Sequence, residues 1–133
     1  MNWATSFKKF EIAAGLLVAL GTLCLLPSAS AFASAFWGGT VKNLPAGDHL
    51  NIRKWPSATS QVSGVYSNGQ RLSMTGRCKN INTGISFRID GPGTPLQKYN
   101  KMRAPYVWCQ IWHEITPGNF ASGWGRGRYM WPQ

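Results

Sequence analysis

Short runs of alternating apolar and polar residues, separated by turn-forming residues, dominate this chain after residue 31. In Leu50–Arg53 every second side chain is apolar, which is typical of a strand with one buried face. Further runs of this kind are Val62–Tyr66, Arg71–Cys78, Trp108–Glu114 and Gly123–Arg126. Asn68-Gly69 lies between two of these runs and supplies the positive φ that a tight hairpin needs. Helical periodicity is almost absent here, so the sequence predicts an all-β fold, a small barrel of about five short strands.

The N-terminal segment has a different character. Lys8 and Lys9 precede the apolar run Ile12–Leu26, which ends at Pro27 and is followed by small residues. This order is typical of a secretory signal peptide. The run is shorter than the roughly 20 apolar residues that a membrane span needs. We therefore expect residues 1–31 to form a hydrophobic signal helix, with an uncleaved membrane anchor as the alternative, and we expect export to the periplasm or the extracellular space.

The charge balance restricts the class of partner. The chain has 14 Lys and Arg against 4 Asp and Glu, and removing residues 1–31 leaves a net charge of +9. A basic surface attracts polyanions through contacts that salt weakens. An exported protein meets the polyanions of the cell wall and envelope first. We therefore expect a cell-wall or envelope polyanion, or an envelope protein, as partner rather than nucleic acid. Contact with a membrane is expected only through an uncleaved N-terminal segment.

The cysteines favour a structural disulfide. Cys24 would leave with the signal peptide, so that Cys78 and Cys109 remain. An even pair of cysteines in an exported chain is most simply a disulfide. Alternation places Cys78 on the side of Met74 and Cys109 on the side of Ile111, so both sulfurs are expected to face the core. A catalytic thiolate is disfavoured, because it would need a neighbouring base and a reducing environment.

Several short motifs follow one another in a recognisable order. They are Leu50-Asn51-Ile52-Arg53 with Pro56, Val62-Ser63-Gly64, Trp108-Cys109-Gln110-Ile111, and Gly123-Trp124 followed by Tyr129-Met130. This series resembles the bacterial SH3 (SH3b) domain family. The resemblance implies an SH3-like barrel over residues 48–131, preceded by a linker at 32–47, and a module that binds rather than catalyses. It also implies that the strands of Cys78 and Cys109 are antiparallel neighbours.

Residues 79–105 stand where that family has a tight turn. They contain chain-breaking residues such as Gly91-Pro92-Gly93 and Pro95, several basic residues, and one alternating run, Ile85–Ile89, that predicts a short strand. A loop of this length in a compact domain is usually functional or disordered. We expect a long inserted loop that could act as a specificity element. Trp37 and Val41 either begin a first strand or pack at the end of the barrel.

Aromatic and basic residues are the best candidates for ligand contact. The phase that buries Ile111 points Trp108 and Trp112 to the opposite face of their strand. Exposed Trp beside Arg or Lys suits sugars, peptide faces and anionic groups. The candidate ligand-binding residues are Arg53, Lys54, Trp55, Trp108, Trp112, Arg126 and Arg128. The alternative is that Trp108, Trp124 and Tyr129 only fill the ends of the barrel.

Catalysis has little support in the sequence. Asp48-His49 and His113-Glu114 are expected to face solvent, and no spacing of Cys, His or carboxylates fits a metal site or calls for a cofactor. We therefore expect no enzymatic activity. The sequence favours a non-catalytic exported binding module that docks to the cell wall or to an envelope protein. The alternative is a secreted basic effector, inhibitor or toxin with a target outside the cell.

Overall fold

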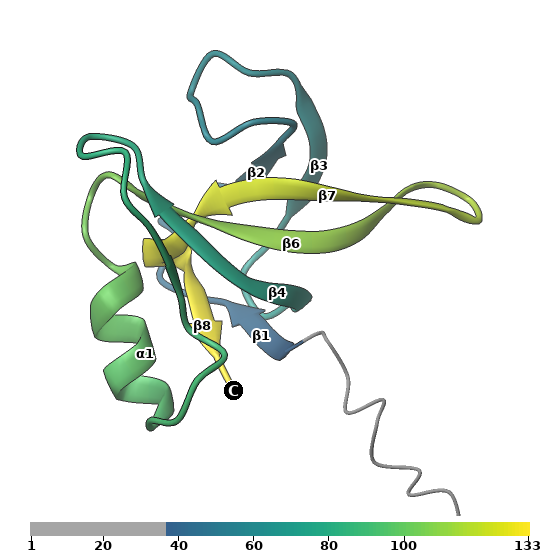
Figure 1. The fold of residues 1–133 in the computed structure, drawn as a ribbon. Coiled ribbons are helices and arrows are strands. Elements are labelled where there is room, and N and C mark those ends of the chain that lie inside the picture. Colours follow the sequence, from purple (N-terminus) through teal and green to yellow (C-terminus); the bar gives the residue numbers. More distant parts are fainter. Residues whose placement is uncertain (1–36) are drawn as a thin grey trace, which may run out of the picture. The chain divides into compact units, whose positions relative to one another are not determined.

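The computed structural model describes residues 37–133. The expected signal helix, its cleavage or anchoring, and Cys24 lie outside the described residues. The described part is mostly β: antiparallel strand pairs build one sheet, and one α-helix packs beside it (Figure 1). In this part of the chain no helix is both long and apolar enough to cross a membrane.

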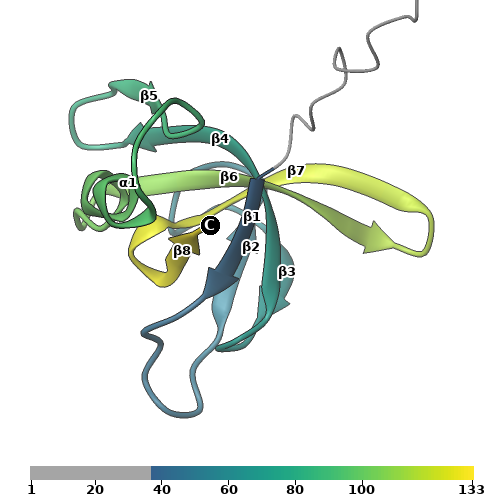
Figure 2. The ribbon, with the colours of Figure 1, turned by 90° about the horizontal axis from the view of Figure 1, so that it is seen from below.

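The sheet contains eight strands. They are β1 (Trp37–Val41), β2 (Leu50–Arg53), β3 (Val62–Tyr66), β4 (Arg71–Asn80), β5 (Ser86–Arg88), β6 (Val107–Thr116), β7 (Asn119–Arg126) and β8 (Met130–Pro132). Their order is β3-β2-β7-β6-β4-β1-β8, and β5 pairs with β4 outside this path. All five main runs predicted from the sequence are strands. Beyond these runs and the short strand predicted within Ile85–Ile89, the structure adds β8 and makes Trp37–Val41 the strand β1. The sheet is open in its hydrogen bonding, with β3 and β8 at the two ends of its strand order. Figure 2 shows the β6–β7 hairpin extending to one side of the other strands.

The predicted linker and inserted loop are more ordered than expected. Trp37–Val41 forms a strand that pairs with β4 and β8, so the first of the two alternatives for this segment holds. Within residues 79–105 the predicted short strand is present as β5, but the rest is not a plain loop. It contains the helix α1 (Pro95–Met102), which lies beside β8 and the 3-10 turn η3 (Gly127–Tyr129) (Figure 1).

Local capping explains why α1 forms where the sequence suggested only breaking residues. The Thr94 side chain accepts a hydrogen bond from the Gln97 backbone N–H at 3.2 Å, and the Gln97 side chain accepts one from the Thr94 N–H at 3.0 Å. This reciprocal pair is a capping box, and Pro95 occupies the first turn, where its missing N–H costs nothing. Tyr99 then packs against Trp131, with ring centroids 4.8 Å apart and planes tilted by 39°. Pro95 therefore begins a helix here and does not mark a loop.

The core lies on one side of β4, β6 and β7 and is completed by β1, β2 and β8. Its fully buried members include Ile52, Met74, Ile111, Met130 and Val41. Gly125 of β7 also borders this core. A Cβ there would lie 2.5 Å from Met130 Cε and 2.8 Å from Ile52 Cδ1, so the core leaves no room for a side chain.

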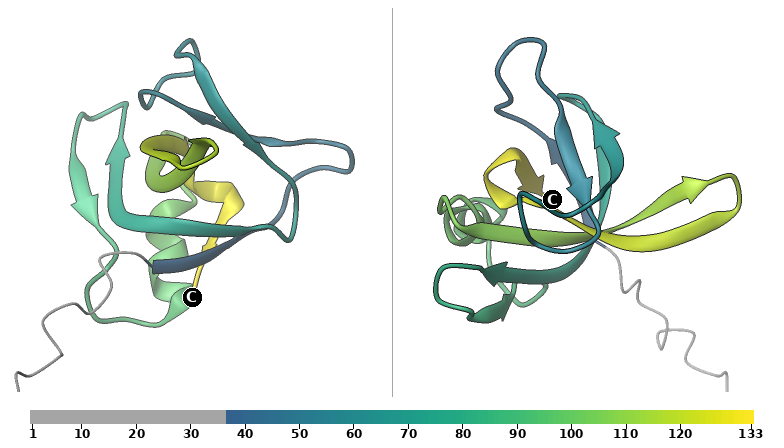
Figure 3. Two further views of the ribbon diagram at one scale, coloured as in Figure 1. Left: turned by 90° about the vertical axis from the view of Figure 1, so that its right-hand side faces the viewer. Right: turned by 90° about the horizontal axis from the view of Figure 1, so that it is seen from above.

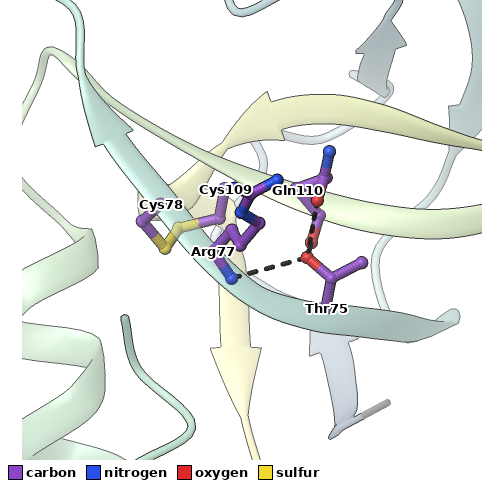
Figure 4. Close-up of a disulfide and its surroundings, with 5 residues drawn as sticks. All are labelled: Thr75, Arg77, Cys78, Cys109 and Gln110. Atoms are coloured by element: carbon purple, nitrogen blue, oxygen red, sulfur yellow. Dashed lines mark hydrogen bonds between the residues drawn. A yellow bond between two sulfur atoms is a disulfide. The ribbon is translucent and has the colours of Figure 1, made fainter. Parts of the chain in front are cut away.

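The predicted disulfide is present. Cys78 and Cys109 face each other across β4 and β6, with their Cα atoms 4.1 Å apart, and both side chains are buried (Figure 4). The bond closes a segment that contains β5 and α1. A Cβ on Gly127 would lie 2.6 Å from the Met102 carbonyl oxygen and 3.2 Å from Cys109 Sγ. The last turn of α1 therefore packs close to the disulfide, and the insertion is clamped at its base.

Two burial predictions are wrong. Trp108 does lie on the face opposite to Ile111, but its side chain is only 2% exposed, because Arg126 and neighbouring groups cover it. His113 was expected to face solvent and is 3% exposed, since it shares the inward phase of Ile111. Glu114, Asp48 and His49 are exposed as expected.

Candidate ligand-binding groove

A groove of about 680 Å³ opens on the face of the sheet that points away from the core. We call this side of β4, β6 and β7 the outer face and the cavity the basic groove. Its cations are Lys54, Arg77, Lys79 and Arg88, its aromatic residues include Trp55 and Trp124, and its polar side chains include Gln110 and Ser122. Phe87 borders the groove and packs against the core. Three separate parts of the chain thus meet there: the end of β2, the β4–β5 pair and the β6–β7 hairpin.

Strand alternation positions the cations of β4. Cys78 points into the core, so Arg77 and Lys79 on either side of it point to the outer face. The pairing of β4 with β5 then brings Arg88 directly across from Arg77. Thr75 Oγ1 donates to Gln110 Oε1 at 2.9 Å and orients this amide beside the groove (Figure 4). Strand alternation around the core-facing Cys78 therefore places both cations on the outer face.

The charges of the groove are poorly balanced. Arg88 donates through Nε to Asp90 Oδ1 at 2.9 Å, and its Nη2 pairs with the same carboxylate. This hydrogen bond from Arg88 lowers the pKa of Asp90 and raises that of Arg88. Among residues 37–133 it is the one ion pair that the structure records. Arg77, Lys79 and Lys54 therefore keep their positive charges without an acidic partner from the described residues.

A structured loop presents the aromatic wall of the groove. Arg53 pairs with Trp124 at the junction of β2 and β7, and Lys54 and Trp55 follow directly. Arg53 Nη1 donates to the Ser60 carbonyl at 2.6 Å, and the Trp55 N–H donates to Ser60 Oγ at 2.9 Å. These bonds hold the loop while Trp55 stays 62% exposed. A large exposed ring on an ordered loop is suited to contact a ligand at small entropic cost.

A second, smaller pocket of about 140 Å³ lies beside Arg53, Trp108 and Arg126. We call it the arginine pocket. The Arg126 guanidinium sits 5.2 Å from the centre of the Trp108 ring and donates to the Pro105 carbonyl at 3.3 Å. Trp108 is thus a buried platform under Arg126 and not the exposed ring that the sequence predicted.

The remaining candidates lie elsewhere. Trp112 is 39% exposed and stacks on Phe120 of β7, with ring centroids 6.4 Å apart and planes 9° from parallel. This pair stands on the β6–β7 hairpin, which projects from the rest of the sheet (Figure 3). Arg128 lies over the Tyr129 ring at 5.3 Å and lines neither cavity.

The sequence-predicted residues therefore divide among several places. Lys54 and Trp55 line the basic groove, whereas Arg53, Trp108 and Arg126 surround the arginine pocket. Sequence reasoning missed Arg77 and Lys79, together with Phe87, Arg88 and Trp124. The signal for the first two was available, because residues that flank a core-facing cysteine in a strand must point outward. The contribution of β5 depended on a pairing that the sequence does not reveal.

The buried histidine of β6 lies against β3. His113 Nε2 lies 3.1 Å from Ser63 Oγ, which also donates to the Ile52 carbonyl at 3.3 Å. His113 Nδ1 has no hydrogen-bond partner among the described residues, so no carboxylate orients the ring as a general base would require. Burial lowers the pKa of His113. Within residues 37–133, no three His, Cys, Asp or Glu side chains gather where a metal ion could bind.

Comparison of the chain with family models, with curated proteins and with solved structures finds no match in any of the three.

Proposed function

We propose that this protein is a non-catalytic, exported binding module that docks through the basic groove to an anionic polymer of the cell envelope. One observation carries the proposal. Lys54, Arg77 and Lys79 converge around Trp55 and Trp124, and no acidic side chain among residues 37–133 pairs with them. Asp90, which follows β5, is engaged by Arg88.

An anionic ligand would offset the repulsion between the cations of the groove. Like charges directly opposite in a sheet are destabilising, and Arg77 faces Arg88 across the β4–β5 pair. Asp90 offsets one of these two charges. An anionic ligand would offset the others and would gain contact with the exposed face of Trp55 as well. Low-dielectric walls of a groove concentrate the field of its charges and raise the local concentration of such ligands.

We further propose that the domain is organised as an SH3b-like barrel. Hydrogen bonding leaves the sheet open, yet Ser63 of β3 contacts His113 of β6, although two strands separate β3 from β6 in the sheet order. A Cβ on Gly64 would lie 2.8 Å from the His113 ring. The sheet therefore curls, as a small barrel requires. The disulfide is compatible with export, because such bonds persist in oxidising compartments.

Co-sedimentation with purified cell-wall sacculi and envelope fractions tests the function. Replacing Arg77 and Lys79 by Gln should weaken binding at low salt by about tenfold or more, since each lost charge contact is worth about 1 kcal/mol. The salt dependence of the remaining binding should also fall. Replacing Lys101 and Arg103 by Gln changes the net charge equally at exposed positions outside the groove, and we expect less than about a twofold effect.

Two results would contradict the proposal. Equal weakening by both pairs of substitutions would mean that net charge, and not the groove, drives binding. Absence of sedimentation at low salt, with recovery of the protein from the culture medium, would favour the alternative of a secreted effector, inhibitor or toxin.

A further inference from the structure

The basic groove, the arginine pocket and the Trp112–Phe120 stack lie on the same face of the sheet. In the register of β6 and β7, Trp108 pairs with Arg126, Gln110 with Trp124, Trp112 with Ser122 and Glu114 with Phe120, without a shift between Trp108 and Glu114. Alternate residues of a strand share a face, and so do directly opposed residues of neighbouring strands. These four pairs therefore form one continuous row along the outer face.

The row is long enough for a polymer. Phe120 and Arg126 are six positions apart on β7, which corresponds to about 20 Å at roughly 3.4 Å per residue. The stack stands at one end of the row, the groove in the middle and the arginine pocket at the other end. Ser122, which lines the groove, pairs with Trp112, so the stack and the groove adjoin each other.

The chemistry changes along the row. At the stack end, Trp112 lies between Ser73 and Ser122 on the neighbouring strands, and Glu114 lies opposite Phe120. Flat apolar rings beside hydroxyl groups are suited to a neutral ring that carries hydrogen-bonding substituents. In the middle, the groove presents cations around Trp55 and Trp124.

The far end of the row is rich in hydrogen-bond donors. Arg53 and Arg126 border the arginine pocket. Each guanidinium donates one recorded hydrogen bond to a backbone carbonyl, so its other N–H groups remain to donate to a ligand. Trp108 is 2% exposed, and its Nε1–H has no partner among the described residues. The residues that line this pocket in the described part of the chain include no acidic side chain. An anionic group in the pocket would meet the remaining N–H groups of the two guanidiniums.

We propose that this row is an extended site for a linear acidic glycan, with an uncharged sugar ring on the Trp112–Phe120 stack and carboxylate-bearing rings in the groove and towards the arginine pocket. The inference rests on the proposed function and specifies its ligand. A single-stranded nucleic acid fits less well, because its regularly spaced phosphates would place one near Glu114, whereas a glycan with acidic groups on alternate rings would not.

Binding of glycan strands of two lengths tests this inference. Peptide-free strands released from sacculi, a disaccharide and an octasaccharide, would be titrated against the full chain by calorimetry. The octasaccharide should bind about tenfold more tightly or better. Replacing Trp112 and Phe120 by Thr should lower the affinity for the octasaccharide about tenfold and leave that for the disaccharide unchanged. The variant Ile115→Thr removes another exposed apolar side chain from the same hairpin and should change neither affinity.

The outcomes separate the two proposals. Equal affinity for the disaccharide and the octasaccharide overturns the extended site but leaves docking through the groove intact. The same conclusion follows if the Trp112/Phe120 variant, with an unchanged circular dichroism spectrum, loses affinity equally for both oligosaccharides. An oligothymidylate of eight nucleotides that binds as tightly as the octasaccharide overturns the choice of a glycan. If neither glycan binds although sacculi sediment the protein, the glycan assignment is wrong, and if sacculi also fail, the proposed function fails with it.

Discussion

Loss of the disulfide should destabilise the domain more than any other small change. Cys78 and Cys109 join β4 to β6 and close the segment that carries β5 and α1. The perturbation is the double substitution of both cysteines by Ala. Alanine is preferable to serine, because both side chains are buried and a hydroxyl group there would need a hydrogen-bond partner.

The magnitude follows from the length of the closed segment. For a sequence separation of 31 residues, the chain-entropy relation gives roughly 3.7 kcal/mol. Removing two buried sulfur atoms adds about 1 kcal/mol each, comparable with a buried methylene group. The expected loss is therefore about 5 to 6 kcal/mol. Natural domains unfold with a total of about 5 to 15 kcal/mol, so the variant should be marginally stable.

Urea unfolding followed by tryptophan fluorescence measures this loss. The midpoint should fall, and the dependence of the unfolding free energy on urea should become steeper, because the unfolded chain without a cross-link is less compact. Each single Cys→Ala variant loses the same bond, so the two single losses should sum to far more than the double loss. An excess of reductant should destabilise the wild type and leave the double variant unchanged.

The reasoning would be refuted by a loss below about 1 kcal/mol with an unchanged slope. Additive single losses would also refute it, because they would mean that the two sulfurs contribute by separate packing and not by a shared bond.

Three further changes probe the packing and the titration of the domain. Burial lowers the pKa of His113 in the folded state, so the unfolded state takes up the proton first as the pH falls below about 6.5. The free energy of unfolding should therefore decrease on acidification. Urea titrations at pH 8, 6 and 5 measure this decrease, and the His113→Gln variant should lose this part of the pH dependence. Gly127→Ala should cost about 1 to 3 kcal/mol in urea unfolding, because its Cβ would clash with the Met102 carbonyl, whereas Gly91→Ala, which meets no atom within 4 Å, should cost almost nothing. Thr94→Ala should remove the cap of α1, which costs about 1 kcal/mol and lowers the melting temperature by about 4 to 8 °C. Thr94→Ser should retain stability. An unchanged melting temperature of the Ala variant would contradict this role of the cap.

Local patterns in the sequence predicted much of the fold. Alternation located β2, β3, β4, β6 and the second half of β7, because a strand with one buried face must change polarity at every residue. The same alternation turned Cys78 and Cys109 towards the core, where the structure joins them. The capping box of α1 was also present in the sequence but was outweighed by the glycines and prolines around it.

The candidate site was only partly predictable. Lys54 and Trp55 were candidates because a basic and an aromatic residue stand side by side in a loop, and both line the groove. Trp108 was selected for its phase and is buried, because phase determines the face of a strand and not what covers that face. The prediction that His113 faces solvent was wrong for a related reason, because the strand β3 that covers this side chain is distant in sequence.

By itself, the sequence determined the alternation of its strands, the basic charge and the inward direction of the two cysteines. Strand alternation depends on neighbouring residues alone, and net charge depends on composition alone. Only the tertiary structure decided that Arg77, Arg88, Trp55 and Trp124 share one groove. That meeting depends on which strands pair and in which register, and a shift of one residue would turn every outward cation inward. Local sequence patterns therefore constrain the strands, whereas the binding surface depends on long-range pairing between them.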